Sequence, residues 1–263
     1  MTHQARKRFG QNFLHDPAII ERIVQAIRPQ PGQRLVEIGP GKGAITLPLL
    51  AACGRLEVIE LDRDLVQPLA DRAQGIGELV IHQQDALRFD FAALAGDGRV
   101  RTVGNLPYNI STPLLFHLIA QSDSIQDMHF MLQQEVVDRM AATPGNRDYG
   151  RLSIMIQYHC RVEPLFGVGP GAFQPAPRVH SAFVRLTPWQ QPPVSVRDTD
   201  CLATLVRQAF SQRRKTLRNT LKGLLSEQDI LATGTDPTAR PETIPLEQYA
   251  ALADRLAEHK QGE

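Results

Sequence analysis

The chain has 263 residues, enough for one large domain or for a medium and a small one with a buried core. Its 29 Lys and Arg residues against 28 Asp and Glu leave a net charge of +1, and 42% hydrophobic and 22% charged residues are near the globular average. These values exclude a small disulfide scaffold, a disordered chain and a uniformly basic nucleic-acid binder. Any basic binding surface must therefore be local.

The cysteines and the start of the chain indicate the compartment. The three cysteines are far apart and show no CxxC spacing, so we expect no zinc site and a reduced, cytoplasmic chain. The basic start at residues 6–8 is not followed by an apolar run, which argues against an export signal. No apolar stretch approaches the roughly 20 residues that cross a bilayer, so we expect no membrane segment.

Short apolar runs alternate with helical stretches along the chain. A first helix is expected from the Asp16-Pro17 cap to about Ile27. Strands are then expected at 35–38, 56–60, 79–82, 100–103, 128–132 and 181–186, with helices from 44, 62, 112 and 133. This alternation predicts an α/β fold with a largely parallel sheet.

A proline-rich segment divides the chain after residue 188. Residues 188–193 (PWQQPP) combine three prolines with polar residues, which is typical of a linker. We expect a first domain over 1–188 that includes the basic N-terminal segment, a linker over 189–194, and a small domain over 195–263. Leucines recur at helical spacing in the last region without strand-like runs, so we expect it to be all-helical.

Three strand ends predict a nucleotide-like ligand at the carboxyl edge of the sheet. The glycine-rich segment from Glu37 to Gly43 connects the first strand to its helix, where the backbone can approach an anion, although it would also suit a plain tight turn. Glu60 ends the next strand 21 positions after Gly39, near the offset at which a carboxylate meets ribose hydroxyls. Asp85 follows the third strand and can accept from an adenine-like amine, whereas Asp62 is expected to cap a helix.

The fourth strand end, Asn105-Leu106-Pro107-Tyr108, fits a site for a planar amine. The Asn105 oxygen and a backbone carbonyl held by the Pro107 turn can accept both N–H groups of an exocyclic amine, and Tyr108 offers a ring face. Two acceptors aim the nitrogen lone pair outward at an electrophile. An ordinary Asn-Pro turn would look the same in isolation, and the three preceding strand ends favour the amine site.

In this order and spacing, these residues resemble the motifs of class I S-adenosylmethionine-dependent adenine-N6 methyltransferases. Three further segments narrow the resemblance: 8–14 (RFGQNFL), 173–181 with the pattern FxPxPxVxS, and 210–219 (FSQRRKTLRN). Together they are similar to the ribosomal RNA small-subunit adenine-N6,N6-dimethyltransferase family of the bacterial KsgA/RsmA type. The resemblance implies a Rossmann-like class I methyltransferase sheet with a small all-helical C-terminal domain.

The resemblance also implies a role for each matching residue. The cofactor S-adenosylmethionine would be bound, without a metal, by the N-terminal segment and the strand ends: Asn12, Leu14, Gly39, Gly41, Glu60, Asp85 and Asn105. The catalytic tetrapeptide would be Asn105, Leu106, Pro107 and Tyr108. Tyr108 and Phe173 would be stacking walls for the target base, although Phe173 could equally be an anchor of the proline-rich loop.

The implied substrate is a pair of adjacent adenosines in a hairpin loop near the 3′ end of 16S small-subunit rRNA, each methylated twice at N6. The implied partner is this rRNA within a pre-ribosomal particle, bound by a monomer without an obligate protein partner. Two runs of cations would contact its phosphates, because residues 211–222 hold five cations and no acidic residue. The candidate RNA-binding residues are Arg6, Lys7, Arg8, Arg213, Arg214, Lys215, Arg218 and Lys222.

Three alternatives stay open at this point. A large-subunit rRNA adenine methyltransferase of the erythromycin-resistance type shares the patterns of 11–13 and 105–108, although the segment 213–219 argues against it. A ribosome-assembly factor would use the same surfaces mainly for docking. An NAD-dependent oxidoreductase would share the glycine turn but would need a proton-handling residue at the fourth strand end.

Overall fold

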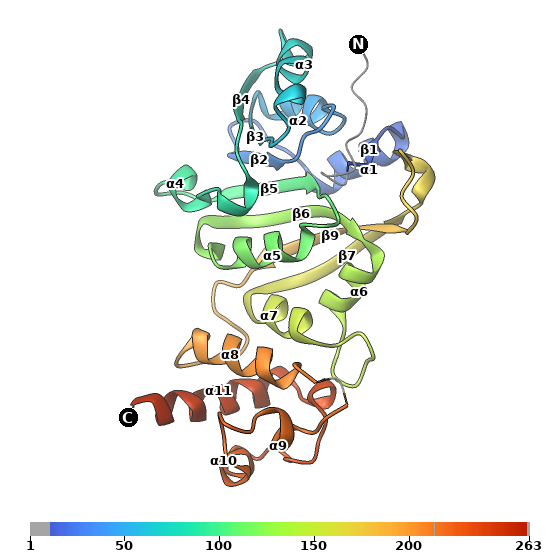
Figure 1. Ribbon diagram of the computed structural model, residues 1–263. Coiled ribbons are helices and arrows are strands. Elements are labelled where there is room, and N and C mark those ends of the chain that lie inside the picture. The colour runs from blue at the N-terminus through green and yellow to red at the C-terminus, as the bar shows by residue number, and fades with distance from the viewer. Residues whose placement is uncertain (1–10, 213, 262–263) are drawn as a thin grey trace. The chain divides into compact units, whose positions relative to one another are not determined.

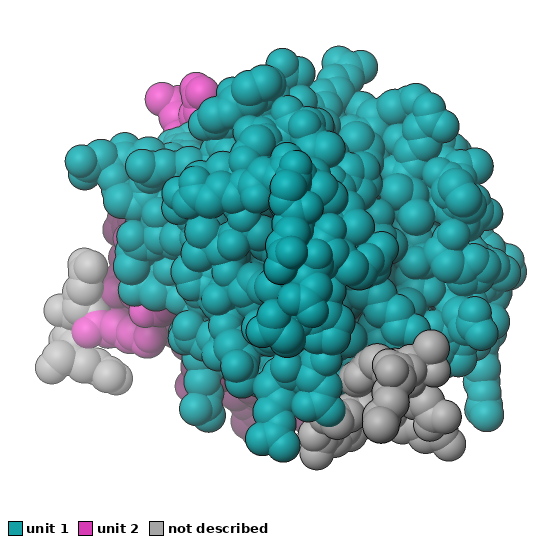
Figure 2. All heavy atoms as spheres, turned by 90° about the horizontal axis from the view of Figure 1, so that it is seen from above, with its two compact units in different colours: residues 1–137, 161–188 teal, residues 138–160, 189–263 magenta. Residues whose placement is uncertain are grey.

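The computed structural model describes residues 11–212 and 214–261. The described chain divides into two compact units, coloured separately in Figure 2. Unit 1 extends to residue 137 and takes up the chain again over 161–188; unit 2 comprises 138–160 and the residues from 189 onward. The sequence prediction assigns 138–160 to the first domain, but helix α7 (Arg151–His159) packs against helix α8 (Thr199–Ala209) and groups with unit 2.

A seven-stranded sheet in the order β4-β3-β2-β5-β6-β9-β7 forms the centre of unit 1 (Figure 1). The strands are β2 (Leu35–Ile38), β3 (Arg55–Ile59), β4 (Glu78–His82), β5 (Val100–Asn105), β6 (Ile125–Gln133), β7 (Cys160–Val168) and β9 (Ser181–Pro188). The first five run parallel, and β9 pairs antiparallel with β6. The carboxyl ends of β2, β3, β4 and β5 therefore meet at one edge, where ligands bind in open α/β sheets.

Helices connect these strands. They are α1 (Pro17–Ile27), α2 (Thr46–Cys53), α3 (Arg63–Ala73), α4 (Phe91–Ala95), α5 (Ser111–Ile119) and α6 (Gln134–Ala141), with short 3-10 turns η2 (Ala86–Arg88), η3 (Ser122–Ser124) and η4 (Pro170–Ala172). The predicted cap of α1 is confirmed, because the Asp16 carboxylate accepts from the backbone N–H groups of Ala18 and Ile19. The predicted cap of α3 is confirmed in the same way, since Asp62 accepts from the N–H of Asp64.

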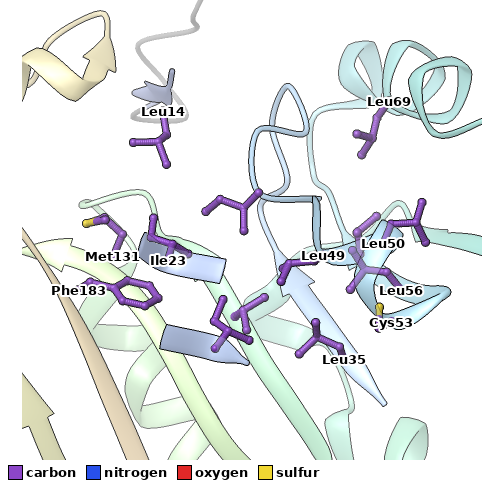
Figure 3. Packing of buried hydrophobic residues seen from close by; sticks show 14 of the residues in the cluster. Leu14, Ile23, Leu35, Leu49, Leu50, Cys53, Leu56, Leu69, Met131 and Phe183 are labelled. Carbon is purple, nitrogen blue, oxygen red and sulfur yellow. The ribbon is translucent and has the colours of Figure 1, made fainter. Parts of the chain in front are cut away.

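The apolar faces of these elements meet in one buried cluster, part of which is drawn in Figure 3. Strand β2 is buried along its whole length, as a central parallel strand requires. Leu49, Leu50 and Leu56 are fully buried between α2 and the sheet. Leu14 joins the same cluster from the N-terminal segment, so the start of the described chain is fixed to the core of unit 1.

A two-stranded ribbon joins distant parts of unit 1. Strand β1 (Phe13–Leu14) pairs antiparallel with β8 (Phe173–Gln174), with Leu14 opposite Phe173. The His15 N–H extends the pairing with a 2.9 Å bond to the carbonyl of Ala172. We call residues 11–14 the strap, because this pairing ties them to the segment that precedes β9.

Unit 2 is helical in its described C-terminal part, as predicted for the end of the chain. After α8 it contains α9 (Leu217–Thr220), α10 (Glu227–Ala232), the turn η5 (Pro241–Thr243) and α11 (Leu246–Gln261). Tyr249 is fully buried, and its hydroxyl donates to the carbonyl of Pro241 at 2.8 Å. No helix among the described residues has the length and apolar character needed to cross a membrane.

The strands expected near 35–38, 56–60, 79–82, 100–103, 128–132 and 181–186 are confirmed, with small shifts at their ends. Strand β7 and helix α7 are not foreseen by the sequence pattern. Strand β7 contains Pro164 and alternates only weakly in burial. A proline is tolerated there because β7 is the last strand of the sheet, and an edge strand does not need every N–H for pairing.

Candidate active site

A cavity of about 330 Å³ opens at the carboxyl edge of the sheet in unit 1. Its walls come from the loops after β2, β3, β4 and β5 and from the strap. Every residue predicted to bind the cofactor or to form the tetrapeptide lines it: Asn12, Leu14, Gly39, Gly41, Glu60, Asp85, Asn105, Leu106, Pro107 and Tyr108. Parallel strands bring together residues from Gly39 to Tyr108, about 70 positions apart in the sequence, and the strap adds Asn12 and Leu14.

The glycine turn after β2 forms part of the cavity wall. Gly39 and Gly41 have φ of 68° and 56°, a conformation that favours glycine. A Cβ on Gly41 would lie 3.1 Å from the ring of Phe13, so the missing side chain also lets the strap approach. Lys42 adds a cation 4.6 Å from the centre of the same ring. The turn and the strap therefore fit each other closely, which the sequence pattern of the turn alone does not predict.

Glu60 holds the turn from the end of β3. One carboxylate oxygen accepts from the Gly41 N–H at 3.2 Å, and the other accepts from the Asp62 N–H at 2.8 Å. Glu60 is only 6% exposed, and burial raises the pKa of its carboxyl. Each oxygen retains a lone pair, so Glu60 can accept hydroxyl groups of a ligand while it fixes the loop.

Glu37 lies at the end of β2 below the turn. It is 1% exposed, and burial raises the pKa of its carboxyl to about 8. Within the described residues its Oε2 has no well-formed hydrogen bond, since the nearby Thr46 hydroxyl offsets the effect of burial on the pKa only in part, and the residue lines the cavity. A buried acceptor without a partner is costly, so a ligand with a donor at this end of the cavity would satisfy it.

A further part of the cavity wall follows β4, two strands away from β2. Asp85 is half-buried and accepts from the Leu87 N–H at 3.0 Å, which caps the short turn η2. Its carboxylate can accept further, as expected for a contact with an adenine amine. Asp62 does more than cap α3, because it also accepts from the Gln11 side chain of the strap at 3.1 Å.

The tetrapeptide 105–108 begins at the last residue of β5, and hydrogen bonds orient its acceptor groups. Gly104 precedes it, and a Cβ there would lie 2.4 Å from the Ile38 carbonyl oxygen, so only glycine lets β5 lie this close to β2. The Asn105 side-chain N–H donates to the carbonyl of Asn12 in the strap at 2.9 Å, which fixes which end of the amide is the acceptor. The Pro107 carbonyl already accepts from Ile110 N–H and from the Ser111 hydroxyl. The carbonyl of Leu106 accepts no such bond among the described residues and is therefore the backbone acceptor of the tetrapeptide left open to a ligand amine.

The two predicted stacking rings have different surroundings. Tyr108 lines the cavity, and burial raises the pKa of its hydroxyl, which lies 2.6 Å from the Ser181 hydroxyl. Phe173 is 2% exposed, belongs to the core cluster and does not line the cavity. In this structure Phe173 has the environment of an anchor for the loop that follows β8.

The predicted RNA-binding residues are described only in part. Arg6, Lys7, Arg8 and Arg213 lie outside the described residues. Arg214, Lys215, Arg218 and Lys222 are exposed on unit 2. The side chain of Arg218 lies 3.7 Å from that of Glu227 on α10, so folding supplies an acidic neighbour that the segment itself lacks. Among these described cations, only Arg218 has an ion pair.

The structure adds three strap and turn residues to the site. Gln11, Phe13 and Lys42 all line the cavity. Gln11 and Phe13 stand in the segment 8–14 that carried the resemblance, so the sequence contains a signal for them. Their contacts with Asp62 and Gly41 depend on the folded strap and have no local signal. Across 11–212 and 214–261, no group of three His, Cys, Asp or Glu residues is arranged to hold a metal ion.

Comparison with known families decides among the remaining alternatives. The family model described as "Ribosomal RNA adenine dimethylase" matches residues 2–258, nearly the whole chain. The chain belongs to this family. Membership makes it a methyltransferase of ribosomal RNA adenine and removes the oxidoreductase alternative.

Relatives of the adenine dimethylase family agree in length as well as in sequence. The chain is 61% identical over 258 residues to the ribosomal RNA small subunit methyltransferase A of Pseudomonas aeruginosa, covering 97% of this chain and 96% of the relative. It is 56% identical over 256 residues to the protein of the same name from Marinobacter nauticus, covering 97% and 93%. Both relatives therefore carry the name of a small-subunit rRNA methyltransferase and match this chain over nearly its whole length.

Solved structures support the fold. A dimethyladenosine transferase from Plasmodium falciparum has a TM-score of 0.77 at 24% identity, covering 95% of this chain and 98% of that one. The 23S rRNA methyltransferase ErmE has a TM-score of 0.72 at 23% identity, covering 94% and 100%. The Rossmann-like methyltransferase sheet with a helical C-terminal region is thereby confirmed.

Proposed function

We propose that this dimethyltransferase uses S-adenosylmethionine to methylate N6 of two adjacent adenosines in a hairpin loop near the 3′ end of 16S small-subunit rRNA, twice each. The observation that carries the proposal is the oriented amide of Asn105, whose N–H is committed to Asn12 while its oxygen remains an acceptor beside the Leu106 carbonyl. The names of the relatives support the small subunit as the substrate.

The residues around the cavity fit the cofactor. The unpartnered buried oxygen of Glu37 suits an ammonium donor, and Glu60 retains lone pairs for ribose hydroxyls. Gly39 and Gly41 keep the turn free of side chains, Asp85 would accept from the adenine amine, and the strap residues Asn12 and Leu14 would cover the site. When bound, S-adenosylmethionine supplies a methyl group that passes from sulfur to nitrogen as the S–C bond breaks and the N–C bond forms.

The tetrapeptide prepares the adenine nitrogen for this transfer. Asn105 Oδ1 and the Leu106 carbonyl would accept the two N–H groups of N6, which disfavours delocalisation of the lone pair into the ring. Orientation and electrostatic stabilisation of the amine, which becomes cationic, would supply the rate enhancement. The cationic nitrogen releases its proton to solvent, so the chain needs no strong general base. Tyr108 would stack on the flipped base.

The exposed cations of unit 2 would hold the RNA by its phosphates while the base is turned outward. Arg214, Lys215 and Lys222 are the strongest described candidates, because Arg218 shares its charge with Glu227. We infer that the protein acts as a monomer in the cytoplasm on rRNA within a pre-ribosomal particle, without an obligate protein partner. It would act without a metal, since methyl transfer needs no Lewis acid when the electrophile is already a sulfonium.

The test is transfer of labelled methyl to small subunits that lack the modification, with the product mapped by nuclease digestion. We expect N6,N6-dimethyladenosine near the 3′ end, and its loss in Asn105→Ala. Asn146→Ala, in an exposed turn of unit 2, is the matched control and should keep full transfer. Methylation of large-subunit RNA would contradict the substrate. Tight binding of the particle without transfer would favour a role in assembly alone.

A further inference from the structure

One hydrogen bond joins Tyr108, the last residue of the catalytic tetrapeptide, to Ser181, the first residue of β9. The hydroxyl oxygens of Tyr108 and Ser181 are 2.6 Å apart, a normal distance for a hydrogen bond between two hydroxyls. Ser181 is 73 positions later in sequence and opens strand β9. Its backbone position is fixed by pairing with Gln133 of β6.

Among the described residues, the hydroxyl of Ser181 is linked to the site by its bond to Tyr108. It is 0% exposed and does not line the cavity, whereas Tyr108 does. A tyrosine ring that is held only at Cβ can swing about the Cα–Cβ bond, and a second hold at the hydroxyl oxygen fixes the long axis of the ring. The bond therefore sets where the ring lies beside the cavity, whereas the ring face can still turn about this axis.

The strap holds Asn105, the first residue of the tetrapeptide. Asn105 donates to the carbonyl of Asn12, which immediately precedes strand β1. Strand β1 pairs with β8, and six residues, 175–180, connect β8 to Ser181. The first and last residues of the tetrapeptide are thus held by two segments that are hydrogen-bonded to each other.

We propose that Ser181 is a positioning residue that fixes the Tyr108 ring against the target base and thereby controls the second methyl transfer more than the first. The inference rests on the proposed function. In the first transfer, N6 presents two N–H groups, which Asn105 Oδ1 and the Leu106 carbonyl accept. The transfer replaces one of these hydrogens with a methyl group and releases one proton.

The second acceptor, N6-monomethyladenosine, has one N–H group left. It can therefore make only one of the two hydrogen bonds that oriented the first acceptor. Ring stacking must then carry a larger share of the alignment between the lone pair and the methyl donor. A ring whose long axis can swing away from the base should therefore slow the second transfer most, and monomethyladenosine should accumulate.

The experiment is a product analysis of Ser181→Ala, Tyr108→Phe and the double variant on small subunits that lack the modification. Each single variant should slow the second transfer by about two- to tenfold, the range of one neutral hydrogen bond, and raise the ratio of monomethyl to dimethyl product. The double variant should be no slower than the slower single variant, because both changes remove the same bond. Calorimetric affinity for S-adenosylmethionine should stay unchanged in all three.

Ser153→Ala is the matched control for burial. Ser153 is also 0% exposed, and its hydroxyl bonds within unit 2 to Arg139 and Gly150, so its loss should lower stability without changing the product ratio. An unchanged product ratio in Tyr108→Phe, or additive losses in the double variant, would overturn the inference while wild-type dimethylation upheld the proposed function. Absence of dimethyladenosine from the wild type would instead overturn the proposed function itself.

Discussion

Side chains around the cavity of unit 1 are held by short internal contacts, whereas the cations over 214–222 of unit 2 extend into solvent. Asn105, Glu60 and Tyr108 each have a partner within 3.2 Å, and Glu60 is almost completely buried. Arg214, Lys215 and Lys222 are exposed and, in the described part of the chain, have no ion pair. We expect the cavity residues to act by orienting the bound ligands, and the cations of unit 2 to act by attracting the phosphates of the RNA.

Substitutions in these two groups of residues should therefore change different measured quantities. A small displacement at the cavity should lower kcat, because orientation within the site contributes much of the rate. Loss of a cation on unit 2 should instead weaken RNA binding and its dependence on salt, because phosphate contacts release counterions.

The largest effect is expected for Gly104→Ala. Its Cβ would lie 2.4 Å from the Ile38 carbonyl oxygen, so β5 must move away from β2 and carry Asn105 with it. We expect kcat to fall by about 100-fold and stability by about 1–3 kcal/mol. Single-turnover kinetics and urea unfolding measure the two. Gly171→Ala is the control, since a Cβ there has nothing within 4 Å; wild-type kcat in Gly104→Ala would refute the role of this close approach.

The next effect concerns the cations of unit 2. The double reversal Arg214→Glu and Lys215→Glu should weaken RNA binding by at least tenfold and lower the salt slope by about 0.7–0.9 for each lost phosphate contact. Cofactor affinity should not change. Binding is measured by filter retention over a range of salt. Reversal of the exposed Arg28 and Arg99 changes net charge equally, and the same loss in that variant would show that overall charge alone is responsible.

A pH-dependent effect on stability, with kcat and RNA binding not involved, is expected at Glu37. Its pKa is raised from 4.5 to about 8, so the folded protein binds a proton that the unfolded chain has released between these values. Stability should therefore fall as pH rises through this window, by up to about 1.4 kcal/mol per unit. Glu37→Gln should remove this slope in urea titrations of the ligand-free protein. The exposed Glu78→Gln should keep it, and an unchanged slope in Glu37→Gln would contradict the assignment.

The strand ends were predictable because the chemistry there is local. A short apolar run, a turn and a polar residue at the carboxyl end suffice to place Glu60, Asp85 and Asn105 at one edge once the sheet is parallel. The strap was only half predictable. Its sequence marks it as part of the site, but the acceptor that it offers to Asn105 is a backbone carbonyl, which no residue type reveals.

The remaining contacts depend on pairings over long sequence distances. Strands β1 and β8 have two residues each and lie about 160 positions apart, so they are too short for a hydrophobic periodicity to predict them. Likewise, Glu227 approaches Arg218 only after α9 and α10 have folded. The sequence around Arg218 contains no acidic residue, so it predicts cations without ion pairs. The bond of Ser181 with Tyr108 joins two residues that the motifs already contain, yet only the register of β9 on β6 brings them together.

The smallest expected effect is a gain of RNA affinity in Glu227→Gln. Arg218 and Glu227 are both about half exposed and 3.7 Å apart, so their ion pair is weak, but it must open before Arg218 can reach a phosphate. Without the carboxylate, Arg218 is released and binding should tighten by about twofold, with a salt slope steeper by up to about 1. Glu247→Gln adds the same charge elsewhere on unit 2 and should give less. Equal gains in the two variants would mean that Arg218 contributes only to the general field of unit 2, and that direct phosphate contacts are confined to the unpaired cations beside it.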